Sequence, residues 1–97
     1  MIAIAPDRFD RALAYVNEYH AAELPYPLER EIALRILKRT NALIESEGRD
    51  VSLTRKHELL REAAGEERGM SETLRAFYRK LVNAYWRFPK VSAEAEP

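Results

Sequence analysis

The sequence predicts an all-α fold, a single domain in which a four-helix arrangement is joined by short loops. The chain has 97 residues, 46% hydrophobic and 33% charged, which is typical of one globular domain. Between residues 7 and 88, glycine and proline fall only at 24–27, 48 and 65–69, and the intervals between them carry apolar residues at helical spacing. We expect residues 1–90 to form the helical domain and residues 91–97 to be a flexible acidic tail.

The first helix is expected at about residues 7–22. Pro6 or Asp7 can begin it, and the helix dipole favours an acid such as Asp10 in the first turn. The apolar residues 1–5 are expected to pack as an extended strap. The predicted inner side of the helix consists of Phe9, Ala12, Leu13, Val16, Tyr19 and His20.

The second helix is expected at about residues 27–47. Pro27 suits a first helical position, because a proline has no N–H to leave unpaired there, and Gly48 suits the position after the end. The apolar stripe covers about half of the circumference, which is more than one neighbour needs. We therefore predict that this is the central helix and that it contacts at least two others. The stripe consists of Ile32, Ala33, Ile36, Leu37, Thr40, Leu43 and Ile44.

The third helix is expected at about residues 53–64, with Asp50 or Ser52 as the N-cap and Gly65 as the stop. Its predicted inner residues are Leu53, Leu59, Leu60, Ala63 and Ala64.

The fourth helix is expected at about residues 71–88, with Ser71 as the N-cap and Pro89 as the stop. On a helical wheel of 100° per residue, most of its aromatic side chains fall on one face and are predicted to be core. That face consists of Leu74, Phe77, Tyr78, Leu81, Val82, Ala84, Tyr85 and Phe88.

Trp86 falls outside this face, next to the ridge of Arg75 and Arg79. One interpretation places Trp86 over the edge of the core with arginine stems packed on its ring. The other makes it an anchor for a partner, because Trp and Arg are enriched among interface hot spots. The predicted partner-binding residues are Arg75, Arg79, Lys80, Asn83, Trp86, Arg87 and Lys90.

The residue types of common active sites do not converge in this sequence. There is no cysteine, and no glycine-rich phosphate loop. His20 is expected to be a hydrogen-bonded residue at the core edge, and with Glu23 it supplies only two of the three or four ligands that a metal needs. His57 is expected to be exposed. We therefore predict no catalytic, cofactor-binding or metal-binding residue, and a protein that is not an enzyme.

Two functions follow from these features. The first is association with a protein partner or with another copy, as a small subunit, adaptor, inhibitor or homodimer that uses the last helix. The alternative is a nucleic-acid-binding accessory subunit of a nucleoprotein complex, with the basic residues of that helix on phosphates.

A formal net charge of zero gives the nucleic-acid alternative no support, and the basic face of the last helix is equally that of a solvated surface. Residues 63–74 have the outline of a helix-turn-helix, but Glu66 and Glu67 would then face phosphates. No apolar run is long enough to span a membrane, and the start of the chain lacks a basic signal-peptide region. We expect a cytoplasmic protein without a membrane or small-molecule partner.

Overall fold

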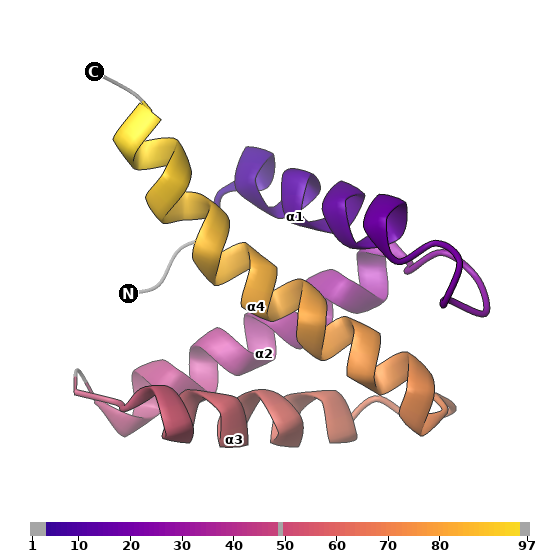
Figure 1. The fold of residues 1–97 in the computed structure, drawn as a ribbon. Coiled ribbons are helices and arrows are strands. Elements are labelled where there is room, and N and C mark those ends of the chain that lie inside the picture. Colours follow the sequence, from indigo (N-terminus) through magenta and orange to yellow (C-terminus); the bar gives the residue numbers. More distant parts are fainter. Residues whose placement is uncertain (1–3, 49, 96–97) are drawn as a thin grey trace.

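The chain folds into helices that follow one another in the order α1 (Pro6–Tyr19), α2 (Arg30–Glu47), α3 (Leu53–Gly65) and α4 (Glu72–Ala95) (Figure 1). The computed structural model describes residues 4–48 and 50–95, with side chains up to residue 86. The described residues contain four helices and no strand, so the predicted all-α class is confirmed.

The helix that contacts all of the others is α4. It packs against α1, α2 and α3, and α2 also packs against α3 (Figure 1). The start of α1 lies near Tyr85 and its end near Phe77, so α1 and α4 run in opposite directions. The prediction that α2 touches at least two helices is confirmed, but the central position belongs to α4. The reason is the size of the side chains, since Tyr78 and Tyr85 are the largest fully buried residues and both belong to α4.

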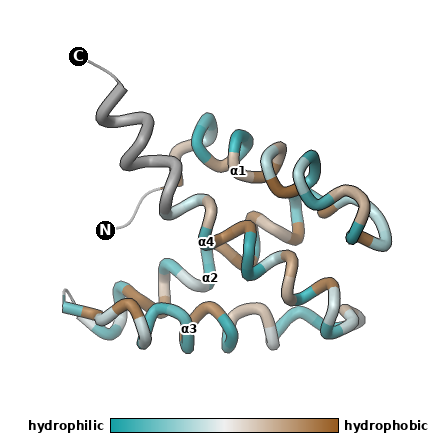
Figure 2. The backbone as a smooth tube through the Cα atoms, viewed as in Figure 1, coloured by the Kyte–Doolittle hydropathy of each residue, from teal (hydrophilic) through white to brown (hydrophobic). Residues whose placement is uncertain are grey.

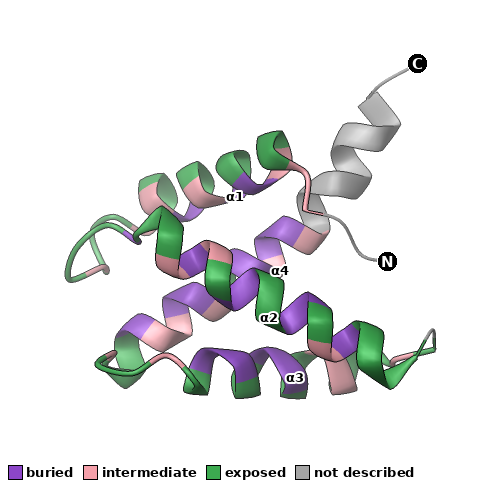
Figure 3. Cartoon of the chain, turned by 180° about the vertical axis from the view of Figure 1, so that it is seen from behind, coloured by how far each residue is buried: buried purple, intermediate pink, exposed green. Residues whose placement is uncertain are grey.

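The apolar faces of the helices meet in a shared core (Figures 2 and 3). Two tyrosine hydroxyls bind the backbone from inside it. Tyr85 accepts hydrogen bonds from the Ala5 N–H at 3.1 Å and from Arg8 Nη2 at 2.7 Å. Tyr78 accepts one from the Glu29 N–H at 3.0 Å. Each hydroxyl therefore fixes the segment that leads into a helix of the other half of the chain.

The start of α2 differs from the prediction, because the helix begins at Arg30 and not at Pro27. The two residues before it use their backbone in tertiary contacts. The Leu28 N–H donates to Asn17 Oδ1 at 2.8 Å, while the Leu28 side chain is buried in the core. The end of α2 agrees with the prediction, since Gly48 follows Glu47 with a φ of 110° that favours glycine. The first helix ends at Tyr19, three residues before the expected end.

The predicted caps of α3 and α4 are confirmed. Ser52 Oγ accepts from the Arg55 N–H, and Ser71 Oγ accepts from the Leu74 N–H, each at 3.1 Å. The predicted stop at Pro89 is wrong, because α4 continues to Ala95. A proline removes one backbone hydrogen bond from a helix without preventing those that follow.

The two ends of the chain lie partly outside the described residues. Of the expected strap, Ile4 packs against the core and the Ala5 N–H is bound by Tyr85, while residues 1–3 are not described. At the other end, residues 91–95 belong to α4 and residues 96–97 are not described. The flexible acidic tail at 91–97 stays a prediction.

Candidate partner-binding surface

The geometry of α4 divides the predicted partner-binding residues between two edges of its buried face. Leu74, Tyr78, Leu81 and Tyr85 form the middle of that face. At 100° per residue, Arg75, Arg79 and Trp86 lie together on one edge, and Asn83 lies about 60° beyond Trp86, on the side of α4 away from Leu74. We call these four residues the Trp86 flank. Lys80 lies on the opposite edge, about 120° from Trp86. Arg87 and Lys90 lie beyond the described side chains.

Trp86 is partly buried and packs against the hydrophobic core. Its position agrees with the interpretation of a residue at the core edge, while part of the side chain remains accessible. A tryptophan held in this way keeps few rotamers, so contact with a partner costs it little conformational entropy.

Arg75 fixes the side of α4 that faces α3. Its Nη2 donates to the backbone oxygen of Glu67, in the turn after α3, at 3.0 Å. Its Nη1 lies 3.8 Å from Glu72 Oε2. Arg75 therefore holds the α3–α4 turn, and the Trp86 flank continues from this contact along the side toward α3.

Arg79 is the cation of the Trp86 flank that has no acid partner among the described residues. The side chain is partly buried, and no carboxylate oxygen of the described residues lies within 4.0 Å of it. Asn83 is one turn further on and is also partly buried. The flank thus presents a guanidinium, an amide and an indole in sequence.

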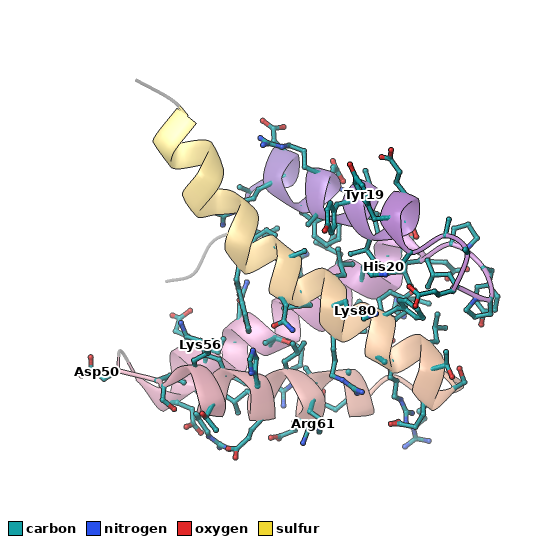
Figure 4. The ribbon with its side chains drawn as sticks, in the orientation of Figure 1. Tyr19, His20, Asp50, Lys56, Arg61 and Lys80 are labelled. Atoms are coloured by element: carbon teal, nitrogen blue, oxygen red, sulfur yellow. The ribbon has the colours of Figure 1, made fainter. Side chains whose placement is uncertain are left out.

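Lys80 belongs to a separate group of side chains at the end of α1 (Figure 4). Its Nζ lies 4.6 Å from the centroid of the Phe77 ring. The hydrogen bond with His20, at 2.8 Å, and the charge of Lys80 both hold the pKa of the Glu23 carboxyl below its ordinary value. His20 is half-buried against Phe77, as predicted, with ring centroids 5.9 Å apart. No group of three or more potential metal ligands occurs in the described part of the chain.

Several exposed apolar residues were not part of the predicted surface. Tyr19 is 67% exposed, although its spacing placed it with the core residues of α1. Its ring lies against that of Tyr15, with centroids 4.6 Å apart. Leu53 is 66% exposed, although its spacing placed it on the inner face of α3. Both residues stand at a helix end, where a periodic pattern continues past the point at which the neighbouring helix stops covering it.

Two further predictions concern His57 and the length of the apolar segments. His57 is exposed, as predicted. None of the described helices is both long and apolar enough to span a bilayer. Comparisons of the chain with protein-family models, with curated proteins and with solved structures find no match.

Proposed function

We propose that this chain is a non-enzymatic helical module that works by association, as a subunit, adaptor, inhibitor or homodimer, and that the Trp86 flank is its contact surface. The observation that carries the proposal is the partly buried Trp86 on the same flank as Arg79, a cation without an acid partner among the described residues. Tryptophan and arginine are the residue types that most often dominate binding energy at protein interfaces.

The packing of Trp86 supports an anchor role. The side chain is held by the core on one side, so it is positioned before a partner arrives. Arg79 is also partly buried, which keeps its stem in place while its charge is available. A pre-organised aromatic residue beside a cation gives a binding surface a low entropy cost.

A photo-cross-linking residue placed at Asn83 tests this surface. We expect benzoylphenylalanine at Asn83 to form a defined adduct in an extract of the producing cells, either with a second copy or with one partner. Ala14, which is exposed on α1, is the matched control position and should give no such adduct. The same adducts from both positions, or none from Asn83, would contradict the proposal.

Fluorescence of Trp86, the only tryptophan, separates the two forms of association. In a homodimer, dilution should shift the emission to longer wavelength and increase acrylamide quenching, in parallel with dissociation measured by sedimentation velocity. With a different partner, the emission should be independent of concentration until the partner is added.

Nucleic acid is a second candidate, favoured by the absence of any acid between Thr73 and Trp86. It ranks lower because Arg75 is engaged by the turn after α3 and the chain has no net positive charge. Binding of an oligonucleotide that shifts Trp86 emission at low salt and is lost at high salt would favour the nucleic-acid function.

The cytoplasmic location also stays a prediction.

A further inference from the structure

The acids of α3 lie toward α2, away from α4. Arg55 pairs with Glu47 of α2 at 2.8 Å, and Glu66, at the end of α3, pairs with Arg39 of α2 at 3.0 Å. Glu62 lies within about 20° of Arg55 on the helical wheel. Glu58, the other acid of α3, pairs with Arg55 itself at 3.1 Å.

Leu53 and His57 lie on the opposite edge of α3, Lys56 lies between the two edges at about 100° from Arg55, and none of the three is an acid. Leu53 lies about 160° from Arg55 on the wheel, and His57 lies beyond it in the same direction. Lys56 lies on the side of α3 toward α4, whereas Arg61 points to the far side (Figure 4). Lys56 is partly buried, and no carboxylate oxygen of the described residues comes within 4.0 Å of it.

The Trp86 flank of α4 and these residues of α3 together form a surface whose charged side chains are positive. We call this surface the basic seam, and it consists of Leu53, Lys56, His57, Arg75, Arg79, Asn83 and Trp86. After Glu72, which begins α4 and lies near Arg75, no acid occurs in α4 up to Trp86. In a chain with as many acidic as basic residues, this part of the two helices therefore carries Lys56, Arg75 and Arg79 as its charged groups, together with apolar and neutral polar side chains and no acid after Glu72.

The basic seam includes an exposed leucine at the end where the two helices separate. The start of α3 and the later half of α4 diverge (Figure 1). Leu53, at the start of α3, is 66% exposed for this reason. An exposed leucine offers nothing to a phosphate backbone but gains free energy when it is covered by an apolar side chain.

We propose that the partner held by the basic seam is an acidic protein segment that also carries apolar side chains. Its carboxylates would meet Lys56 and Arg79, and its apolar side chains would cover Leu53 and Trp86. This inference rests on the proposed function, association through the Trp86 flank, and adds the chemistry of the partner. Complementary charge would also set the orientation and the rate of association.

The test uses the full chain and a synthetic 15-residue peptide of glutamates and leucines, with the leucines at helical spacing. The probes for comparison are the same peptide with lysine in place of glutamate, an oligoglutamate of equal length, and oligothymidylate. Binding is followed by Trp86 emission and by backbone amide NMR shifts. We expect only the glutamate–leucine peptide to bind strongly, with shifts confined to the two facing edges of α3 and α4.

A double charge reversal provides the matched comparison. We expect K56E together with R79E to weaken binding of the glutamate–leucine peptide by roughly tenfold or more, since both cations face the peptide. The control is K38E together with R68E, two exposed cations outside the basic seam, with a change below about twofold. Circular dichroism should show equal helix content in both variants.

Three results of the peptide experiment would overturn the inference. They are NMR shifts that map outside the basic seam, tighter binding of oligothymidylate, and no binding of the glutamate–leucine peptide at about 1 mM, the weak limit of specific association. A cross-linked partner at Asn83 whose attached segment is not acidic would also overturn it, while leaving the proposed function intact. Absence of any adduct at Asn83 would contradict the proposed function itself.

Discussion

At the scale of single residues, the hydroxyl of Tyr85 connects the two ends of the described chain. It is buried and accepts hydrogen bonds from the Ala5 N–H and from Arg8 Nη2, and the Arg8 guanidinium lies 4.5 Å from the ring centroid. Removing the oxygen leaves a backbone N–H and a charged group without this acceptor. The cost of an unmet buried donor exceeds the gain from forming an average hydrogen bond.

We predict that Y85F lowers the free energy of unfolding by about 1–3 kcal/mol. Urea denaturation followed by circular dichroism measures it. Y19F is the control, because Tyr19 is 67% exposed and should change stability by less than about 0.5 kcal/mol. Equal effects of the two substitutions would show that the Tyr85 hydroxyl does not hold the start of the chain.

Asn41 is a buried amide without a hydrogen-bond partner among the described residues. Its side chain is 4% exposed, and neither Oδ1 nor Nδ2 is bonded to any group in that part of the chain. A buried amide without partners lowers stability by the free energy needed to remove it from water. We predict that N41L, whose side chain branches at the same carbon, raises the free energy of unfolding by about 1–2 kcal/mol.

The substitution N41L is checked by thermal and urea unfolding, with A42L as the comparison. Ala42 is the next residue of α2 and is exposed, so added apolar surface there should not stabilise the fold. A loss of stability in N41L would mean that the amide makes a polar contact that the structure does not record.

At the scale of elements, α3 begins at a serine N-cap. Ser52 Oγ accepts from the Arg55 N–H, and the exposed Leu53 in the first turn contributes little packing. We predict that S52A lowers the free energy of unfolding by about 1 kcal/mol.

The control for the cap is S46A in the last turn of α2. Ser46 Oγ donates to the Leu43 backbone oxygen at 2.8 Å, in an exposed position where water replaces the bond. Its change should stay within about 0.5 kcal/mol. If S46A proves as costly as S52A, the cap is not what begins α3.

The helices were predictable where the determinants are local. Ser52, Ser71 and Gly48 mark boundaries through their own side chain or backbone, so the sequence around them suffices. The start of α2 was not predictable in this way. The N–H groups of Leu28 and Glu29 donate to Asn17 and Tyr78, and such tertiary hydrogen bonds leave no signal in the local sequence. The continuation of α4 past Pro89 was missed because proline is a strong but not an absolute helix breaker.

The candidate surface was predictable only in part. The wheel placed Trp86 and Arg79 beside the apolar face, and the structure places both at its edge. The helical wheel could not predict which neighbouring helix each edge of α4 would contact. Hence Lys80 was grouped with residues that lie on the other side of α4, and Lys56 and Leu53 of α3, which we propose as part of the basic seam, were not predicted as site residues.

At the scale of the whole molecule, the phenol of Tyr78 makes the free energy of unfolding depend on pH in the alkaline range. Burial raises the pKa of its phenol above the ordinary value of 10.0, and the bond from the Glu29 N–H offsets this only in part. The unfolded chain therefore loses this proton at a lower pH than the folded chain does. The contribution to stability is complete below about pH 10 and is lost as the pH rises toward the folded pKa.

We predict that the free energy of unfolding falls as the pH rises above about 10 and that this fall is shallower in Y78F. Urea denaturation at each pH measures it. Tyr26 is 55% exposed, so Y26F should keep the slope of the parent chain. An unchanged slope in Y78F would assign the alkaline transition to other groups.

The pairing of α1 with α4 has a consequence for synthesis on the ribosome. The hydrogen bond between the Ala5 N–H and the Tyr85 hydroxyl spans 80 positions of sequence. While the nascent chain emerges, α2 and α3 can associate early, since they are adjacent, but the apolar face of α1 must wait until α4 has left the exit tunnel. During that interval, Phe9 and Val16 lack the face of α4 with which they share the core, and chaperones that recognise apolar segments would meet α1 first.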